Sequence, residues 1–219
     1  MTDGIILIDK PASMTSFGVV ARIRRVLSQQ AGKKVKVGHT GTLDPFATGL
    51  LILCAGKETK NAMKYIKLDK VYEATIRLGQ TSSTGDPEGE ITEVNGTQPS
   101  REEVEKTVAK FVGDIKQTPP IFSAIKIGGR RAYHLAREGK DVEIPERTVT
   151  IHSLEIVDYD YPELKIRTHV SSGTYIRSLA SDIGQTLGTG AYCTQLRRTK
   201  IAEWDVADAR TLAWFGITD

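Results

Sequence analysis

The stretch of this 219-residue chain that decides its fold is Gly38-His39-Thr40-Gly41-Thr42-Leu43-Asp44-Pro45-Phe46-Ala47-Thr48-Gly49-Leu50. The apolar run 50–54 follows at once and predicts a buried strand. Pro45 disfavours helical geometry at Asp44 and has no backbone donor, so we expect Asp44 to sit on a rigid base beside that strand. Asp-Pro is also a common turn pair. The residues alone therefore allow either a functional carboxylate or a tight surface turn.

Composition places the chain among ordinary globular proteins, with 39% hydrophobic and 26% charged residues. It contains no apolar run near the length of a membrane span and no signal-peptide pattern at Met1. We therefore expect a cytoplasmic protein with no membrane partner. Cys54 and Cys193 both lie in apolar segments, which favours buried, reduced thiols.

The net charge and the positions of cysteine and histidine give further, weaker limits on the possible functions. The formal charge of +3 and the pI near 8.8 permit a nucleic-acid partner without demonstrating one. The four histidines are scattered, and no Cys/His cluster has metal-ligand spacing. We expect neither a metal nor a cofactor.

The opening stretch resembles the active-site motif of the TruB-type pseudouridine synthases, in which the aspartate is the catalytic nucleophile and Asp44 takes its place. Other blocks of the same family lie before and after it, so the resemblance extends from Gly4 to about Leu212 in five separated blocks. One local departure is Ser13, which stands where the family usually has glycine. That turn is therefore expected to differ in backbone geometry.

The resemblance implies roles for five further residues. Tyr72 packs against the target base beside the nucleophile, although by itself it reads as a core tyrosine on a strand. Arg177 pairs with the catalytic carboxylate and orients it, as a planar guanidinium can. His39 fills the space that the flipped base leaves, or is simply a turn histidine. Tyr175 lies near the bound nucleotide, and Leu196 lines the pocket.

Two segments are rich in positive charge. Arg22, Arg24 and Arg25 lie on the polar face of a helix expected after Thr15 and Ser16. The segment 126–140 reads as a basic hairpin and helix, which in the family is part of a mobile element that grips RNA. A solvated charged surface is the alternative for both segments.

Local patterns predict the remaining elements. Residues 56–70 read as one basic helix with Ala62, Met63 and Ile66 inward, and 71–78 as a strand with alternate residues buried. Residues 80–89 read as a loop, whose acids Asp86 and Glu88 are too few for a calcium loop.

The resemblance implies an α+β pseudouridine synthase fold, with a central mixed, mostly antiparallel sheet flanked by helices and an RNA-binding cleft across it. We expect residues 1–219 to form one catalytic domain without the PUA domain that many bacterial relatives carry. The implied partner is the T-arm stem-loop of tRNA, and we expect a monomer with no obligatory protein partner.

The expected activity is isomerisation of uridine to pseudouridine at position 55 in the T loop of tRNA, with Asp44 acting on a flipped-out base. Two alternatives remain open. One is a guide-directed synthase that acts on other RNA, and the other is a non-catalytic RNA-binding or chaperone domain in which Asp44 is a turn residue.

Overall fold

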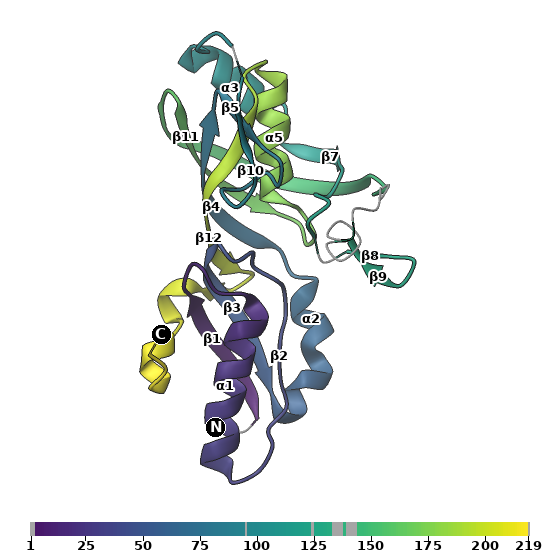
Figure 1. The fold of residues 1–219 in the computed structure, drawn as a ribbon, viewed down its shortest axis with the longest axis vertical. Helices are drawn as coiled ribbons and strands as arrows, with labels where there is room; N and C mark the ends of the chain where they lie inside the picture. The colour runs from purple at the N-terminus through teal and green to yellow at the C-terminus, as the bar shows by residue number, and fades with distance from the viewer. Residues whose placement is uncertain (1–2, 95, 124, 133–137, 139–143, 219) are drawn as a thin grey trace. The chain divides into compact units, whose positions relative to one another are not determined.

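The structure is a computed structural model that describes residues 3–94, 96–123, 125–132, 138 and 144–218 (Figure 1). It divides into two compact units. The first comprises Met1–Tyr72 and Arg197–Asp219, and the second comprises Glu73–Leu196. Strands β4 (Lys70–Leu78) and β12 (Ala191–Ile201) each contain residues of both units. The single catalytic domain expected for residues 1–219 stays a prediction.

The first unit is built around β3 (Thr48–Ala55), in which Gly49 to Ala55 are all buried. β1 (Gly4–Lys10) pairs with β3 antiparallel along its whole length, β2 (Val37–His39) pairs with it antiparallel, and the end of β12 pairs with it in parallel. The core of this unit lies between these strands and α1 (Ser16–Ala31). The predicted buried strand after Asp44 is confirmed.

Local chemistry sets the bounds of α1. The Thr15 hydroxyl accepts the backbone N–H of Gly18 at 2.9 Å, and Gly32 ends the helix in the left-handed region at φ 63°. Ser13, just ahead of the helix, has φ 61°. The serine therefore adopts backbone geometry that favours glycine, and the expectation of a different geometry at this turn is wrong.

The single helix expected over residues 56–70 is wrong in detail. The segment forms a 3₁₀ helix, η1 (Gly56–Asn61), followed by the short α2 (Ala62–Ile66), and Lys70 already belongs to β4. Met63, expected inward, is 60% exposed. The inward aromatic residue is Tyr65, whose hydroxyl donates to Glu58 at 2.6 Å and whose ring packs edge-on to Trp204.

The remaining elements of the first unit lie near the end of the chain. They are β13 (Trp204–Asp205), η2 (Val206–Asp208) and η3 (Leu212–Phe215).

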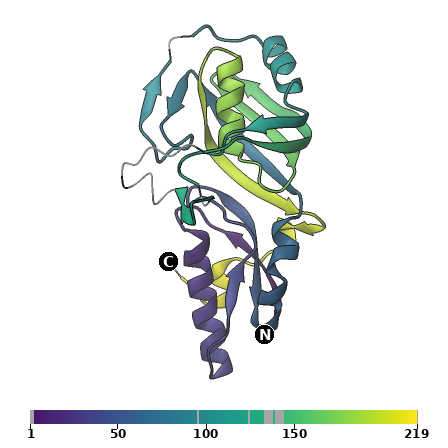
Figure 2. The same cartoon turned by 90° about the vertical axis from the view of Figure 1, so that its right-hand side faces the viewer.

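The second unit contains the strand order β4-β11-β10-β7, with β12 on the other side of β4. β10 (Arg147–Asp160) is antiparallel to both β11 (Glu163–Val170) and β7 (Gly113–Gln117). α3 (Arg101–Ala109) packs against β10 and against α5 (Ile176–Thr186), as Figure 2 shows. The predicted α+β class and the mixed, mostly antiparallel sheet are confirmed.

Two short hairpins complete the second unit. β5 (Gln80–Ser82) pairs with β6 (Ile91–Glu93), so the segment expected as a loop over 80–89 begins as a strand. β8 (Lys126–Ile127) pairs with β9 (Arg130–Arg131). Tyr133, His134, Arg137 and Lys140 of the expected basic segment lie outside the described residues.

Cys54 and Cys193 are both buried, as expected. Among the described residues, no helix combines the length and the apolar content needed to cross a membrane.

Candidate active site

Asp44 lies half-buried in the turn between β2 and β3. Its carbonyl accepts the N–H of Ala47 at 3.1 Å. Thr40, at the start of the turn, donates both its N–H and its hydroxyl to the Ile52 carbonyl, at 3.0 and 3.3 Å. The turn is therefore tied to the core strand, which is the rigid setting that the sequence predicts.

Two side chains from the N-terminal elements hold the residues on either side of Asp44. The Ser16 hydroxyl accepts the N–H of Leu43 at 2.8 Å and donates to its carbonyl at 3.0 Å. The Lys10 ammonium is fully buried and donates to the carbonyls of Pro11, Met14 and Pro45, at 2.7, 2.7 and 3.2 Å. Because Leu43 and Pro45 are both fixed, the backbone at Asp44 has little freedom.

Arg198 is a third anchor of the same turn. Its guanidinium, 1% exposed, donates to the carbonyls of Leu50 at 2.7 Å and Gly41 at 3.2 Å. At Gly49, with φ 103°, a Cβ would collide with the backbone of Arg198. Sequence reasoning missed Lys10 and Arg198 as anchors. The signal for both was a charged residue in an apolar strand pattern.

The other predicted site residues of the first unit are His39 and Tyr72. His39 ends β2 in the same turn as Asp44, and its Nδ1 accepts the N–H of Gly41 at 3.4 Å. Tyr72 lies on β4 and is buried. In the second unit, Leu196 is buried on β12. The roles of these three residues stay predictions.

Arg177, the second residue of α5, is 3% exposed and connects two loops of the second unit. Its Nη1 donates to an Asp86 carboxylate oxygen and to the Thr84 carbonyl, both at 2.8 Å, and its Nη2 donates to the Phe122 carbonyl at 2.8 Å. Sequence reasoning missed the ion pair with Asp86, because the two residues are 91 positions apart.

Asp86 is itself almost fully buried and engaged on its second oxygen. That oxygen accepts the Thr84 hydroxyl at 2.6 Å and the N–H of Glu88 at 3.0 Å. A carboxylate with these donors and a buried guanidinium beside it is held in one orientation. The loop over 82–86 is therefore locked onto the start of α5.

A cavity of about 240 Å³ opens beside Arg177. Asp182 lines this cavity and also a second one of about 430 Å³. Burial raises the pKa of the Asp182 carboxyl to about 6. The smaller cavity is lined by Ser82, Ser83, Thr84, Gly85, Thr118, Pro120, Ile121, Phe122, Arg177, Ser178, Ser181 and Asp182.

Tyr175 is the N-cap residue of α5, two positions before Arg177, and no side chain caps the helix there. Its backbone is held instead by the side-chain amide of Gln117, at the end of β7. The structure thus groups His39 with Asp44 in one turn of the first unit, and Tyr175 with Arg177 at one helix start in the second.

Comparison with known proteins gives a consistent result. Residues 24–176 match the model of the TruB family pseudouridylate synthase N-terminal domain, and residues 177–215 match that of the tRNA pseudouridylate synthase B C-terminal domain. The chain is similar to tRNA pseudouridine synthase B of Phocaeicola vulgatus, with 45% identity over 96% of this chain and 91% of the relative. The relative of the same name from Fusobacterium nucleatum is 46% identical over 93% of this chain and 69% of its own length.

Two solved structures are similar to this chain in fold. A chain of a Cbf5-Nop10-Gar1 complex superposes with a TM-score of 0.74 at 29% identity, and one of an H/ACA RNP bound to a substrate RNA containing 2'-deoxyuridine with 0.70 at 27%. This chain is covered over 97% in both cases, but it spans only about half the length of those chains, 53% and 52%. The extent of the family-model match and the identity to full-length relatives place this chain in the TruB family of pseudouridylate synthases.

Proposed function

We propose that this protein converts uridine to pseudouridine in tRNA, at position 55 of the T loop, with Asp44 as the nucleophile. The observation that carries the proposal is the Asp44 turn, which Lys10, Ser16 and Arg198 hold rigidly in a chain of the TruB family. The names of the relatives supply the substrate class, tRNA. The cytoplasmic location and the monomeric state expected from the sequence stay predictions.

The reaction needs a carboxylate, a flipped-out base and a proton transfer from carbon 5 of that base. The bond from N1 to carbon 1′ of the sugar breaks, the base rotates, and a bond forms from carbon 5 to carbon 1′; carbon 5 then loses its proton and N1 ends protonated, so there is no net redox change. An ionised Asp44 can attack carbon 6 of the base or carbon 1′ of the sugar, or can act as the base that forms a glycal. Flipping the uridine out of its stack costs a few kcal/mol, which contacts with the protein must offset.

The other predicted residues have supporting parts in this proposal. Tyr72 would stack on the flipped base, and His39 would occupy the space that it leaves. Arg177 would keep Asp44 ionised and oriented, and Tyr175 and Leu196 would line the nucleotide site. Each of these roles rests on the matching family motif.

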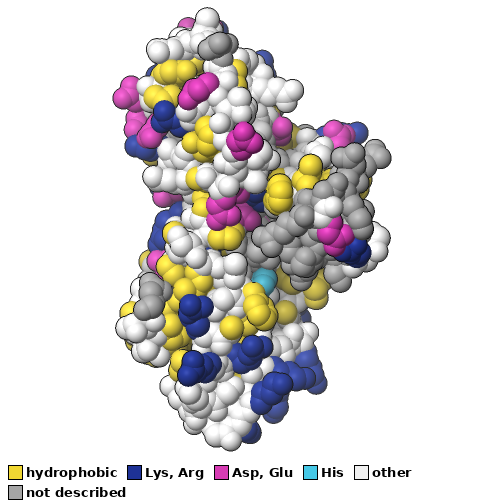
Figure 3. All heavy atoms as spheres, in the orientation of Figure 1, with side chains coloured by type: hydrophobic (Ala, Val, Ile, Leu, Met, Phe, Trp, Pro, Cys, Tyr) yellow, Lys and Arg dark blue, Asp and Glu magenta, His cyan; other side chains and the backbone are white. Residues whose placement is uncertain are grey.

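The charge distribution favours RNA as the partner. The first unit contains 16 lysines and arginines against nine acidic residues, a formal charge of +7, whereas the second contains 14 against 18, a charge of −4. Lys and Arg side chains gather over α1 of the first unit, where Arg22 and Arg25 are exposed (Figure 3). A concentrated positive surface attracts a phosphate backbone more strongly than the net charge of +3 suggests.

The deciding experiment is the variant Asp44→Asn with a bare tRNA transcript. We expect its single-turnover rate to fall by at least about 10⁴-fold, the order seen when one essential catalytic group is removed. RNA affinity should stay within about twofold, since Asp44 contributes no attraction to phosphate. Asp208→Asn, an exposed aspartate of the same unit, is the matched control. Conversion that persists in Asp44→Asn would exclude Asp44 as the nucleophile and leave the non-catalytic RNA-binding alternative open.

The guide-directed alternative is suggested by the resemblance to a chain of the H/ACA RNP, and the same assay separates it. Purified protein and tRNA transcript contain neither guide RNA nor partner protein. Pseudouridine in the T loop under these conditions supports the proposed function, whereas no conversion until a guide is added would favour the alternative.

A further inference from the structure

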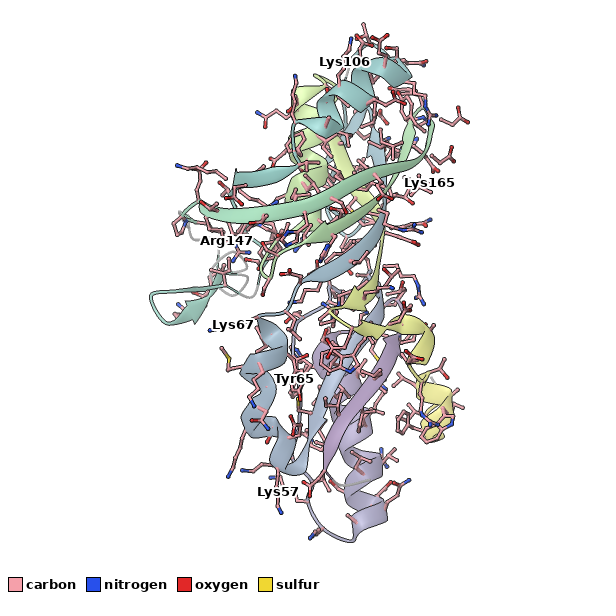
Figure 4. All side chains as sticks on the ribbon, turned by 180° about the vertical axis from the view of Figure 1, so that it is seen from behind. Lys57, Tyr65, Lys67, Lys106, Arg147 and Lys165 are labelled. Carbon is pink, nitrogen blue, oxygen red and sulfur yellow. The ribbon has the colours of Figure 1, made fainter. Side chains whose placement is uncertain are left out.

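Gln117 and Arg147 form a cross-strand pair next to the start of α5. Gln117 ends β7, Arg147 begins β10, and their Cα positions are direct partners in the antiparallel register. Figure 4 shows Arg147 at this end of β10. Both side chains reach the segment 173–175, which leads into the helix that carries Arg177.

Gln117 holds the backbone of Tyr175 on both sides of that residue. Its Oε1 accepts the N–H of Tyr175 at 2.8 Å, and its Nε2 donates to the Tyr175 carbonyl at 3.0 Å. The Gln117 side chain is buried, so water does not compete for these bonds. Tyr175 is in an extended conformation, with φ −102° and ψ 114°, and the amide pairs with it as a neighbouring strand would.

Arg147 holds the ring of the same tyrosine. Its guanidinium carbon lies 4.9 Å from the centroid of the Tyr175 ring, within the range of a cation–π contact. Its Nη2 donates to the Gly173 carbonyl. Among the residues that the structure describes, no carboxylate forms an ion pair with Arg147. Its charge is therefore directed at the ring and at a carbonyl.

Gly173 makes this approach possible. It has φ 93°, and a Cβ there would lie 3.4–3.5 Å from three atoms of the Arg147 guanidinium. A side chain at this position would both strain the backbone and crowd the guanidinium. Three features from separate parts of the chain thus converge on the orientation of one half-buried tyrosine.

We propose that Gln117 and Arg147 are positioning residues for the proposed reaction: Gln117 fixes the backbone of Tyr175, and Arg147 fixes the angle of its ring against the nucleotide. This inference rests on the proposed function. Holding the start of α5 requires only the backbone bonds that Gln117 makes. The Tyr175 side chain does not cap α5. The contact of Arg147 with the Tyr175 ring therefore does not stabilise the helix N-terminus. The contact instead restricts the orientation of the Tyr175 ring.

The arrangement predicts that loss of Arg147 slows turnover rather than binding. For Arg147→Met and Arg147→Lys we expect single-turnover rates about 5- to 30-fold lower, the range that a partly desolvated cation–π contact supports. Lysine keeps the charge but lacks the planar guanidinium, so it should restore little. The Kd for tRNA should change less than about twofold for Arg147→Lys, because the phosphate attraction of the cation is kept.

A double-mutant cycle tests whether Arg147 acts through Tyr175. Single-turnover rates and tRNA affinities are measured for wild type, Arg147→Met, Tyr175→Leu and the double variant, with thermal unfolding of each. The proposal expects the double variant to be no slower than Tyr175→Leu alone. If Arg147→Met lowers the rate by the same factor with and without the tyrosine ring, the proposal is overturned. It is equally overturned if only the affinity changes.

Two further variants complete the experiment. Arg167→Met removes an arginine of β11 that is paired with Glu73 at 2.8 Å, and it should leave rate and affinity unchanged. Gln117→Met keeps the side-chain length and should lower the rate, and in its background the further loss of rate caused by Arg147→Met should shrink. If Gln117→Met does not fold, the Arg147 cycle alone decides. A wild-type protein that forms no pseudouridine would reject the proposed function, whereas an active wild type with additive variants would reject only this inference.

Discussion

Asp182 shows how a single half-buried carboxylate can limit stability. Burial raises its pKa from 3.8 to about 6, so the folded state binds more protons than the unfolded state between these values. Stability from this group is fully present below about pH 4 and is lost as the pH rises through 6. Asp182→Asn should therefore raise the free energy of unfolding at pH 7.5 by about 1 kcal/mol, a figure reduced for solvent screening of this half-exposed group.

Urea denaturation at two pH values checks this prediction. At pH 3.5 the variant and wild type should be nearly equally stable, because the carboxyl is mostly protonated in both states. A variant that is less stable than wild type at pH 7.5 would mean that ionised Asp182 has a favourable partner. Asp114→Asn, at a carboxylate of the same unit that accepts the Thr150 hydroxyl at 2.7 Å, is the control for the loss of one negative charge.

At the scale of elements, the loop 82–86 and α5 depend on the Asp86–Arg177 ion pair. Its atoms lie 2.8 Å apart, and both side chains are at most 5% exposed. Asp86→Asn keeps the shape of the side chain but removes a buried negative charge beside a buried cation. We expect a loss of about 3 kcal/mol in the free energy of unfolding, the order seen when one partner of a buried pair is removed.

Denaturant titration measures the loss, and the turnover assay measures its consequence. The rate should fall more than the RNA affinity, since Asp86 positions the helix start that carries Arg177. Glu90→Gln, an exposed acid a few residues along, is the control and should change stability by less than about 0.5 kcal/mol. An Asp86→Asn variant as stable as wild type would show that the pair does not hold the loop.

The elements also show what a sequence can predict. Strand 71–78 and the cap at Thr15 follow from period and local hydrogen bonding, and both are confirmed. The helix predicted over 56–70 is too long: the segment divides into η1 and α2, and Tyr65 packs there against Trp204, a contact between distant residues that local patterns do not reveal. The Asp86–Arg177 ion pair could not be predicted from local sequence patterns, because its two residues are 91 positions apart.

The candidate site could be predicted only where its residues are close together in the sequence. Asp44 stands out because its turn and its strand are adjacent in sequence, and the structure confirms that setting. Lys10 and Arg198, which hold the turn, come from positions 34 residues before and 154 residues after Asp44. Only the folded chain brings such residues together, and local patterns cannot assign their partners.

At the scale of the whole molecule, the fold separates charge that is mixed along the chain. The closing segment 197–219 joins residues 1–72, and the resulting unit carries +7 while the other carries −4. Part of this excess forms a lysine stripe, defined as Lys57 and Lys60 on η1, Lys64 on α2 and Lys67 at the C-cap of α2. All four are exposed, and Figure 4 shows Lys57 and Lys67 at its two ends.

The lysine stripe is available to phosphates because its ammonium groups are exposed and are not paired with acidic side chains of the described residues. None of its four members forms an ion pair with another described residue. The acid of the same segment, Glu58, instead accepts the Tyr65 hydroxyl and the Asn61 amide. Lys106 and Lys165 of the second unit differ in this respect, since they pair with Glu102 at 2.7 Å and Asp158 at 3.2 Å.

We therefore expect the two sets of lysines to differ in the salt dependence of tRNA binding. Each phosphate contact steepens the plot of log Kobs against log salt by about 0.7 to 0.9, so Lys64→Gln with Lys67→Gln should flatten it by about 1.4 to 1.8. Lys106→Gln with Lys165→Gln changes the total charge equally but should leave the slope unchanged. Filter binding between about 50 and 200 mM salt measures both. Equal flattening by the two pairs would mean that net charge, and not the stripe, sets the affinity, because only direct phosphate contacts release counterions at a particular surface.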